Sequence, residues 1–381
     1  MLGSRQRPYL KPYVYIIILV SVVSIFLFGT YVFPPRNSFI CYIFSGCING
    51  EFNHRRPTAS RELTDAEIAS RVVIREILKR PLVQSKNPKI AFMFLTPGPL
   101  PFEKLWHKFF DGHDGRFSIY VHASREKVSH SSPHFVGRDI RSEKVTWGEM
   151  SMVDAEKRLL ANALIDPDNQ HFALFSESRI FCDAISSYLI TICTSVSVVF
   201  LFTNSSIFDD PGPHGSGRYS ERMLPEIEKK DFRKGSQWFS MKRHHAIIVM
   251  ADSLYYTKFK LYCKRTKDGP NCYADEHYFP TFFNMIDPGG ISNWSVTHVD
   301  WTEGKWHPKS YRNQDVTYEL LKNIASLDKA AQITSTSPKR VMFKPCLWNG
   351  VKRPCHLFAR KFYPETLGRL SHLFSNYTVV V

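Results

Sequence analysis

The sequence predicts an α/β protein with a mostly parallel mixed sheet, and three kinds of observation favour this fold class. Short apolar runs stop at Pro, Gly or polar residues, as buried strands do. A segment with apolar residues at helical spacing separates two of these runs. A strand, a helix and a strand in this order favour parallel pairing, because the helix lets the chain cross one face of the sheet and return.

The predicted elements begin at residue 89. Apolar runs predict strands at residues 89–95, 117–122, 171–175 and 189–202, and helical periodicity predicts a helix at residues 151–165. The last run is too short to span a bilayer comfortably and is rich in β-branched residues. We therefore assign it to a buried strand rather than to a second membrane span.

Polar side chains at the ends of two predicted strands are candidate site residues. His122 ends the second strand, and Glu177 follows the third in Ser176-Glu177-Ser178. Ligands of such sheets bind beyond the carboxyl ends of the strands, which favours a cleft at these positions. His122 taken alone is equally consistent with an ordinary polar residue at a strand end.

An uncharged apolar run at residues 13–33 predicts a transmembrane signal anchor. Its 21 residues can cross about 30 Å of hydrocarbon as a helix, whereas a cleaved signal peptide has an apolar core of about 7–15 residues. Arg5, Arg7 and Lys11 precede the run, so we expect residues 1–12 to lie in the cytosol and the rest of the chain to be luminal. This is a single-pass type II arrangement.

Residues 34–88 predict a luminal stem that precedes a catalytic domain at residues 89–381. The stem mixes Pro, Asn, Arg and Ser and holds one amphipathic helix. Thr64 is its predicted N-cap, with Glu67 three residues on. Four apolar side chains then share one face of this helix: Ile68, Val72, Val73 and Ile77.

Composition limits the class of partner. The 50 Lys and Arg residues exceed the 35 Asp and Glu residues, and the formal charge of +15 favours an anionic partner. A nucleic-acid partner is disfavoured, because the chain has a predicted anchor and no nucleic-acid motif. Eight cysteines are compatible with disulfides in an oxidising compartment. Three sequons, at Asn204, Asn293 and Asn376, are weak indications of N-glycosylation.

Six short motifs follow one another between residues 175 and 362. They are Phe175-Ser-Glu-Ser178, Ser206-Ile-Phe-Asp-Asp-Pro-Gly-Pro213, Arg233-Lys-Gly-Ser-Gln-Trp-Phe239, Cys272-Tyr-Ala-Asp-Glu-His-Tyr-Phe-Pro-Thr281, Val299-Asp-Trp301, and Cys346-Leu-Trp-Asn-Gly350 with Leu357-Phe-Ala-Arg-Lys-Phe362. In this order they resemble the plant branch of the core-2/I-branching β-1,6-N-acetylglucosaminyltransferase family, a group placed with glycosyltransferase family 14. Each motif alone is weak, but their order and spacing make coincidence improbable.

The resemblance implies a GT-A-like fold and an inverting glycosyltransferase that needs no metal. Such an enzyme moves a sugar, N-acetylglucosamine in the animal members, from a nucleotide-sugar donor to a glycan or glycoprotein acceptor. It sits in the Golgi membrane with its catalytic domain in the lumen. Inversion requires a base that takes the acceptor hydroxyl proton and positive charge that stabilises the leaving diphosphate. No cofactor is expected beyond the donor substrate.

The family's base is the Glu of an Asp-Glu pair, which the resemblance maps to Glu276 after Asp275. Without the resemblance, the pair would be read as two acidic residues at a helix N-terminus, where the helix dipole favours them. Trp238 and Glu177 are candidates for acceptor binding. For Trp238, burial in the core is the more common outcome for an aromatic residue.

The resemblance also implies that an Arg and a Lys neutralise the diphosphate in place of a metal. The Lys maps to Lys361 and the Arg, less directly, to Arg353, in a loop that we expect a Cys346–Cys355 disulfide to close, as in animal relatives. His122 completes the candidate nucleotide-sugar site. Fixed guanidinium and ammonium groups are physically adequate for this task. A single lysine is more often part of a solvated surface, but four cations within ten residues make the two interpretations comparable: Lys352, Arg353, Arg360 and Lys361.

Two features of the sequence qualify this interpretation. Asp209-Asp210 is similar to the carboxylate pairs that hold a metal in other GT-A enzymes, but it lies in a Pro/Gly-rich loop, and we assign no metal site. Arg179 stands where close relatives have a cysteine, and the run at 190–207 is unusually apolar. The alternative function is therefore a membrane-anchored glycan-binding protein that keeps the fold without transfer.

Overall fold

The computed structural model describes most of the chain from residue 63 onward. The described residues are 19–21, 23–24, 63–80, 85–125, 128–181, 205, 207, 212–265, 271–303, 305, 307–325, 329–333, 341–345, 347–348, 351–352 and 356–377. Leu63–Val381 forms one compact unit and Met1–Glu62 another. Within the described residues, no helix is both long and apolar enough to cross a membrane, and most of the predicted anchor at 13–33 lies outside them.

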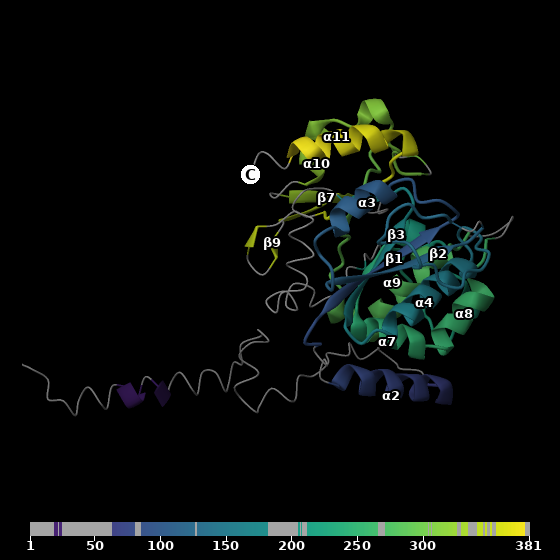
Figure 1. Ribbon diagram of the computed structural model, residues 1–381. Coiled ribbons are helices and arrows are strands. Elements are labelled where there is room, and N and C mark those ends of the chain that lie inside the picture. Colours follow the sequence, from purple (N-terminus) through teal and green to yellow (C-terminus); the bar gives the residue numbers. More distant parts are fainter. Residues whose placement is uncertain are drawn as a thin grey trace, which may run out of the picture. The chain divides into compact units, whose positions relative to one another are not determined.

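A four-stranded sheet with the strand order β2-β1-β3-β5 lies at the centre of the larger unit (Figure 1). Its strands are β1 (Lys89–Thr96), β2 (Phe117–Ala123), β3 (Asn169–Ser176) and β5 (Ser240–Lys242). β1 pairs in parallel with β2 and β3, and β5 pairs antiparallel with β3. The prediction of a mostly parallel mixed sheet is confirmed for this central sheet. The strand expected at 189–202 lies outside the described residues.

Side chains alternate along β1 between two hydrophobic cores. Ala91 and Met93 belong to one core, whereas Phe92 and Phe94 belong to the other, and all four are almost fully buried. A sheet with both faces covered needs apolar residues at successive positions, because each face must pack against its own layer. This is why the strands appear in the sequence as continuous apolar runs rather than as alternating ones.

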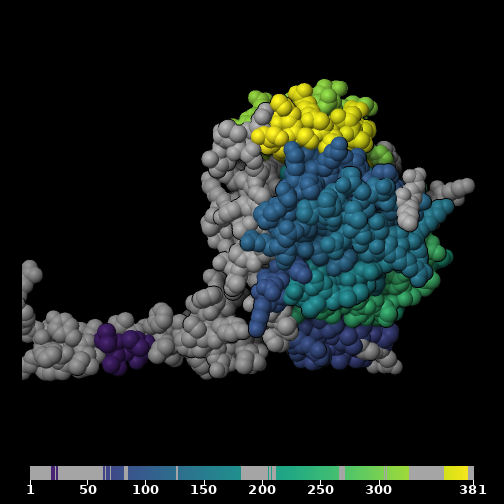
Figure 2. All heavy atoms as spheres, in the orientation of Figure 1, coloured from purple at the N-terminus to yellow at the C-terminus, as the bar shows by residue number. Residues whose placement is uncertain are grey.

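Helices cover both faces of the sheet (Figure 1). One layer contains α4 (Met150–Leu164), α7 (Arg243–Ala251), α8 (Leu254–Tyr262) and α9 (Ala274–Ile286), and the other contains α3 (Glu103–Phe110), α10 (Tyr318–Ile324) and α11 (Leu367–Tyr377). In the space-filling view (Figure 2), the yellow atoms of α11 lie against the blue segment that holds α3. Lys108 of α3 accordingly donates a hydrogen bond to Ser375 of α11 at 3.4 Å. The predicted helix at 151–165 is confirmed as α4.

The remaining described elements are short. They are α6 (Pro213–Ser216), β4 (Ile180–Phe181), β6 (Thr297–Val299), β7 (Lys329–Ile333), β8 (Val341–Pro345), β9 (Leu347–Trp348), β10 (Val351–Lys352), β11 (Phe358–Arg360) and 3₁₀ turns at Glu221–Met223, Pro288–Gly290, Asn313–Asp315 and Pro364–Thr366. β4, β11 and β6 form a second sheet in that order, in which β11 is parallel to β6 and antiparallel to β4. Because β4 follows β3 after three residues, the second sheet begins next to the carboxyl end of β3.

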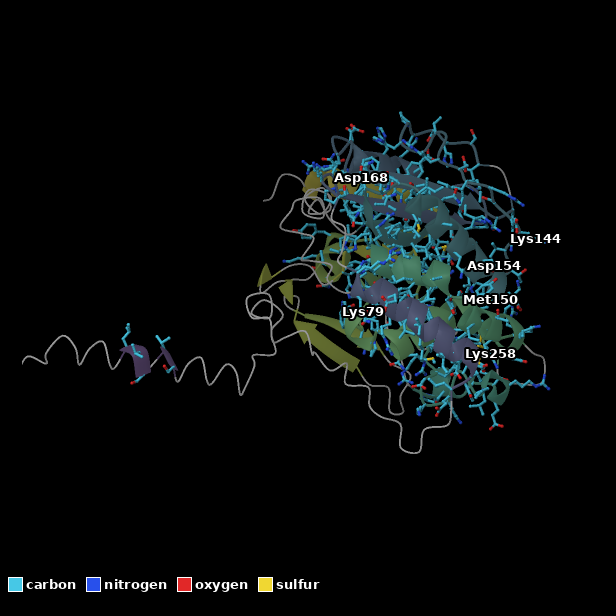
Figure 3. All side chains as sticks on the ribbon, turned by 90° about the horizontal axis from the view of Figure 1, so that it is seen from below. Lys79, Lys144, Met150, Asp154, Asp168 and Lys258 are labelled. Carbon is cyan, nitrogen blue, oxygen red and sulfur yellow. A yellow bond between two sulfur atoms is a disulfide. The ribbon has the colours of Figure 1, made fainter. Side chains whose placement is uncertain are left out.

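The helix that the sequence places in the stem is α2 (Asp65–Lys79), and it packs on α7 and α8 within the larger unit. The predicted capping box is confirmed, since the Thr64 Oγ1 accepts from the Glu67 backbone N–H and the Thr64 N–H donates to the Glu67 carboxylate. In the view from below (Figure 3), α2 crosses the helical layer with Lys79 at its carboxyl end. Glu67 and Ile74 are the buried side chains of α2, whereas Ile68, Val72 and Val73 are about half exposed.

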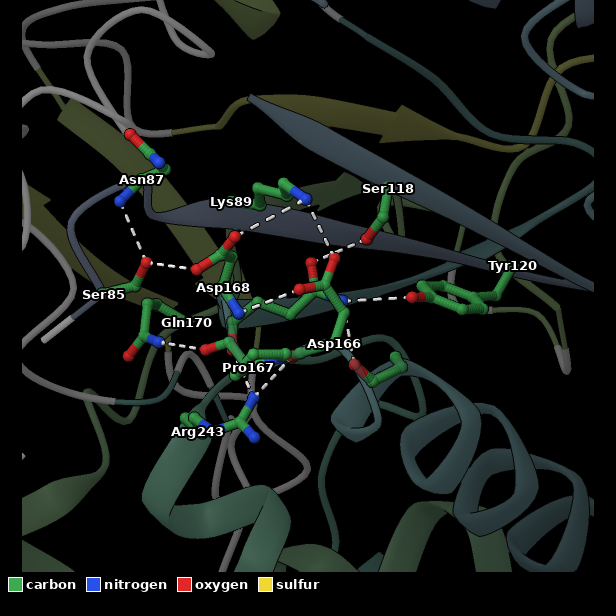
Figure 4. Close-up of polar contacts among 12 residues, drawn as sticks. Ser85, Asn87, Lys89, Ser118, Tyr120, Asp166, Pro167, Asp168, Gln170 and Arg243 are labelled. Carbon is green, nitrogen blue, oxygen red and sulfur yellow. Dashed lines mark hydrogen bonds and ion pairs between the residues drawn. The ribbon is translucent and has the colours of Figure 1, made fainter. Parts of the chain in front are cut away.

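A polar network ties the amino ends of β1 and β3 to the end of α4 (Figure 4). The Lys89 ammonium lies 3.0 Å from the Asp166 carboxylate and 3.8 Å from that of Asp168. The Arg243 guanidinium donates to the backbone carbonyls of Leu164, Asp166 and Asn169. It thereby satisfies carbonyls that the helix end leaves without intrahelical partners. The opposite edge of the sheet carries the candidate site.

One disulfide joins Cys263, at the end of α8, to Cys272, just before α9, with 5.0 Å between the Cα atoms. The sequence did not single out this pair. The pair predicted instead, Cys346 and Cys355, lies outside the described residues, so that pairing stays a prediction.

Aromatic rings fill the core between the sheet and α3. The ring centroid of Trp106 lies 5.3 Å from that of Phe94 and 5.1 Å from that of Phe175, and Trp106 is 2% exposed. These rings meet edge to face, an arrangement that adds to the free energy gained from burial.

We expect Trp106→Ala to lower the free energy of unfolding by about 3–5 kcal/mol, because it removes a large buried side chain and leaves a cavity. Trp147→Ala is the matched control, since Trp147 is 50% exposed. Urea unfolding of the purified protein measures both changes. Equal losses for the two variants would show that the Trp106 cluster is not a core of the fold.

Candidate active site

The candidate site forms where the ends of β3 and β11 meet the start of α9. Glu177 follows β3, Arg360 ends β11 and is followed by Lys361, and Glu276 lies in the first turn of α9. The backbone N–H of Phe362 donates to the carbonyl of Ser178 at 3.1 Å, which joins the chain after β11 to the chain after β3. Segments far apart in the sequence thus present charged side chains to one place.

Asp275 and Glu276 are neighbours in α9 but face different surroundings. Both stand in the first helical turn, where carboxylates are favoured by the helix dipole. Asp275 is 2% exposed, and its Oδ1 has no hydrogen-bond partner among the described residues. The Glu276 side chain is 27% exposed and lies among cations. Burial at the N-terminus of α9 therefore accounts for Asp275, whereas the partly exposed Glu276 side chain can be reached by a substrate.

Two cations, Arg218 and Lys234, contact the Glu276 carboxylate. Its Oε2 lies 3.4 Å from Arg218 Nη1 and 3.7 Å from Lys234 Nζ. Each cation in turn lies over an aromatic ring, Arg218 over Tyr273 at 4.7 Å and Lys234 over Trp301 at 5.9 Å. The backbone N–H of residue 235 also donates to the Glu276 carbonyl at 2.7 Å. A carboxylate fixed in this way can accept a proton from a hydroxyl group placed beside it.

Arg360, at the end of β11, packs on the aromatic side chain of Trp238. Its guanidinium carbon is 4.5 Å from the Trp238 ring centroid, a distance typical of a cation–π contact. Burial lowers the pKa of Arg360 to about 10, and the charges of Glu177, Glu276 and Asp275 oppose this shift. Arg360 therefore stays protonated at neutral pH.

Lys361 is the second cation of this strand end. Burial and the charge of Arg360 lower the pKa of Lys361, while the charge of Glu177 raises it. The structure thus brings together four residues that the sequence predicted for the site: Glu177, Trp238, Glu276 and Lys361. Trp238 is only 6% exposed, so its predicted contact with an acceptor stays a prediction.

A buried carboxyl group, Glu156 of α4, lies behind this cluster. It is fully buried, and Gln237 Nε2 donates to its Oε1 at 3.2 Å. Burial raises the pKa of Glu156 well above its usual range, and the charge of Asp275 raises it further. Burial and the charge of Glu276 raise the pKa of Asp275 to about 7, against hydrogen bonds from the backbone and the charge of Arg360. Its surroundings therefore favour the neutral, protonated form of Glu156.

Sequence reasoning missed Glu156, although a signal was present. Glu156 falls on the same helical face as the apolar residues Met152, Leu159, Leu160 and Ala163 of α4. A charged residue on the buried face of a helix indicates a group that is paired or neutral. Arg218 and Arg360 were also missed as neighbours of Glu276, because only the tertiary structure places them there.

His122 lies at the carboxyl end of β2, as predicted. Its side chain is buried and contacts residues outside the Glu276 cluster. Its Nε2 accepts hydrogen bonds from Arg158 Nη1 at 3.0 Å and from the Glu143 backbone N–H at 3.2 Å. Burial and the charge of Arg158 lower the pKa of His122 to about 4, so the ring is neutral at neutral pH. In the described part of the chain, no contact given for His122 reaches the Glu276 cluster. Its role in donor binding stays a prediction.

Several predicted features are only partly described or lie outside the described residues. Arg353, Asn204 and Asp209-Asp210 are outside them, and the backbone of Asn376 is in α11. Asn293 is exposed at a left-handed backbone position with φ 50°. Among the described residues, no three His, Cys, Asp or Glu side chains are placed to hold a metal ion. Metal independence stays a prediction, since Asp209-Asp210 is not among them.

Comparison with known proteins identifies relatives of this chain. The model of the family described as Core-2/I-Branching enzyme matches residues 90–325. The chain is 33% identical over 308 residues to Glycosyltransferase BC10 of Oryza sativa subsp. japonica. The aligned region covers 72% of this chain and 74% of the rice protein. The range matched by the family model begins in β1 and ends after α10, so it includes Glu276 and ends before Lys361.

We expect Glu156→Gln to stabilise the protein relative to wild type as the pH rises. The folded state holds the Glu156 proton more tightly than the unfolded state, so stability falls as the pH rises from the unfolded pKa towards the folded one. Gln keeps the shape but has no proton to lose. Between pH 5 and pH 8, the stability difference should grow by up to about 1.4 kcal/mol per pH unit.

Urea unfolding at pH 5 and pH 8 measures this difference. Glu76→Gln is the control, because Glu76 is an exposed carboxylate paired with Lys79 at 3.1 Å. A Glu156→Gln variant that loses stability equally at both pH values would show that Glu156 acts as an ionised group.

Proposed function

The chain belongs to the Core-2/I-branching enzyme family and is a glycosyltransferase, and we propose that it is an inverting enzyme that works without a metal. In this proposal, it moves a sugar from a nucleotide-sugar donor to a glycan or glycoprotein acceptor. N-acetylglucosamine, which animal members of the family transfer, is the first donor sugar to test.

The observation that carries the proposal is the position of Glu276. Its carboxylate is partly exposed and contacts Arg218 and Lys234, and its charge acts on Arg360, which directly precedes Lys361 in the chain. Inversion in a single displacement needs a base on one side of the sugar and a leaving group on the other. A base and two cations in one cluster are the parts that this reaction requires.

The proposed step is a direct displacement at the anomeric carbon. Glu276 takes the proton of the acceptor hydroxyl while the hydroxyl oxygen bonds to the anomeric carbon. The bond from that carbon to the diphosphate oxygen breaks, and the nucleoside diphosphate leaves with the bonding electrons. Lys361, with Arg353 as its predicted partner, stabilises the charge that develops on the diphosphate. Fixed cations can do this without a metal, because their charge lies where the negative charge appears.

We also propose that the protein is a type II Golgi membrane protein with its catalytic domain in the lumen. The apolar run at 13–33 and its basic flank support this topology. The Cys263–Cys272 disulfide supports an oxidising compartment, since disulfides are rare in the cytosol. The exposed position of Asn293 is compatible with N-glycosylation.

The alternative of a glycan-binding protein without transfer rested partly on Arg179. The structure buries Arg179 between the rings of Phe175 and Phe358, at 4.5 and 4.9 Å from their centroids, and its guanidinium donates to the Leu174 carbonyl. The fold thus accommodates this departure from the family pattern inside the core. The described site residues do not favour loss of transfer, so the enzyme is the preferred function.

We expect Glu276→Gln to lower transfer by about 10²–10⁴-fold while donor binding is kept, because the amide has the same size but accepts no proton. Transfer is measured with a panel of nucleotide sugars, and binding is measured with UDP by calorimetry. Glu319→Gln, an exposed change on α10, is the control and should leave both unchanged. A Glu276→Gln enzyme with wild-type transfer would remove Glu276 as the base.

We expect transfer to survive EDTA and Lys361→Ala to lower turnover by about 10²–10³-fold, the range for loss of one preorganised group at a developing charge. Lys322→Ala, an exposed lysine of α10, is the matched control. An enzyme that is inactive in EDTA, recovers with Mn²⁺ and tolerates Lys361→Ala would place donor binding at Asp209-Asp210 instead.

A further inference from the structure

We propose that the exposed indole of Trp147 binds a sugar of the acceptor next to the sugar that carries the reacting hydroxyl, and so forms a second acceptor subsite beside Glu276. This inference rests on the proposed function and deepens it, because it makes the preferred acceptor an oligosaccharide rather than a single sugar. Three features of the described residues support it: an exposed aromatic face, a rigid seat for that face, and a continuous series of contacts from it to Glu276.

Trp147 differs in exposure from the tryptophans of the core. It is 50% exposed, whereas Trp106 and Trp238 are 2% and 6% exposed. It lies in the segment between β2 and α4, where the labelled residues Lys144 and Met150 flank it in Figure 3. One exposed aromatic residue is ordinary by itself. What distinguishes this indole is how firmly it is held and where it lies.

The backbone at Trp147 and Gly148 is fixed to the segment that leads into α9. The Trp147 carbonyl accepts a hydrogen bond from Arg265 Nη1 at 3.1 Å, and the Gly148 carbonyl accepts one from the Ala274 N–H at 3.2 Å. Gly148 has φ +75°, and a Cβ at this position would lie 2.5 Å from a ring carbon of Tyr273. Glycine is therefore required for this close approach.

The indole itself is held by neighbouring side chains. Its ring centroid lies 5.0 Å from that of Tyr273 and 6.2 Å from that of His307, and the Arg265 guanidinium carbon lies 5.5 Å from it. These contacts limit the rotation of the side chain before any ligand binds. A ligand that packs on the indole therefore loses little affinity to the ordering of this side chain.

Tyr273 connects the indole to the proposed base. It is the N-cap of α9, and the Arg218 guanidinium carbon lies 4.7 Å from its ring centroid. Arg218 Nη1 in turn lies 3.4 Å from Glu276 Oε2. Each contact in the series from Trp147 to Glu276 is thus 5.0 Å or shorter. Because two side chains stand between them, a sugar on Trp147 is a neighbour of the sugar that reacts at Glu276.

A sugar matches the chemistry of this surface. Sugar rings have apolar C–H faces that pack on flat aromatic side chains, and hydroxyl groups at their edges that need hydrogen-bond partners. Arg265 and His307 are exposed and place polar groups beside the indole. An apolar partner segment would instead need a contiguous apolar patch. An aromatic face with polar neighbours therefore favours a glycan.

The test measures acceptor binding and transfer as a function of acceptor length. The probes are galactose, mannose, glucose and xylose with their β-1,4-linked di- and trisaccharides, and binding to the full-length protein is measured by calorimetry in the presence of UDP. We expect wild type to bind the oligosaccharides of at least one series about tenfold more tightly than the monosaccharide, because they reach Trp147.

Trp147→Ala should remove this gain. We expect it to raise Kd and KM for the preferred oligosaccharides by about tenfold, and to leave UDP affinity and kcat/KM for the monosaccharide within about threefold of wild type. Trp147→Phe keeps a flat aromatic face and should keep most of the preference for longer acceptors.

Tyr318→Ala is the matched control. Tyr318 is 48% exposed and begins α10, which belongs to the helical layer on the other face of the sheet. We expect this variant to keep the affinity for UDP and the length preference of wild type. The calorimetric readout needs no transfer, so it separates failure of this inference from failure of the proposed function, which Glu276→Gln tests.

Three results would overturn the inference. The first is a wild-type protein that binds oligosaccharides no more tightly than monosaccharides. The second is a Trp147→Ala variant that loses activity on monosaccharides and on oligosaccharides by the same factor, since Trp147 would then only support the start of α9. The third is unchanged oligosaccharide binding in Trp147→Ala, which would leave a polypeptide partner as the occupant of this surface.

Discussion

The charge balance at the start of α9 is the constraint on which the rest of the site depends. Glu156, Glu177, Asp275 and Glu276 lie close together in partly or fully buried surroundings, and burial of unpaired carboxylates is costly. The protein meets this cost in two ways. Burial favours the protonated form of Glu156, while Arg218 and Lys234 contact the Glu276 carboxylate. The proposed base, Glu276, is therefore held by the same cations that offset the cost of its partial burial.

In this fold, the residues that stabilise the central sheet are separate from those of the candidate site. Both faces of the central sheet are closed by hydrophobic layers, and the amino edge is tied by Lys89, Arg243 and the turn after α4. The carboxyl edge is then free to carry charged side chains, as in other α/β proteins. The second sheet adds β11, which brings two cations to this edge from near the end of the chain.

Local signals in the sequence predicted much of the fold, because each depends on neighbouring residues alone. The apolar runs of β1, β2 and β3, the periodicity of α4 and the Thr64 capping box are of this kind. Helical periodicity did not show which face of α2 is buried, since Glu67 lies inside and Val72 outside. Spacing did not identify the Cys263–Cys272 disulfide, because its separation of nine is shared by Cys346 and Cys355. The order of motifs predicted Glu276 and Lys361 as site residues, but the partners of a charge are set by tertiary contacts that no single motif encodes.

A crystal structure of the enzyme with a nucleoside diphosphate and an acceptor glycan tests the central claim most directly. The account predicts an acceptor hydroxyl oxygen about 2.6–3.2 Å from the Glu276 carboxylate, and diphosphate oxygens in contact with the Lys361 ammonium. It would be contradicted by an acceptor hydroxyl beyond the reach of Glu276, or by a diphosphate bound through a metal ion on carboxylates elsewhere in the chain.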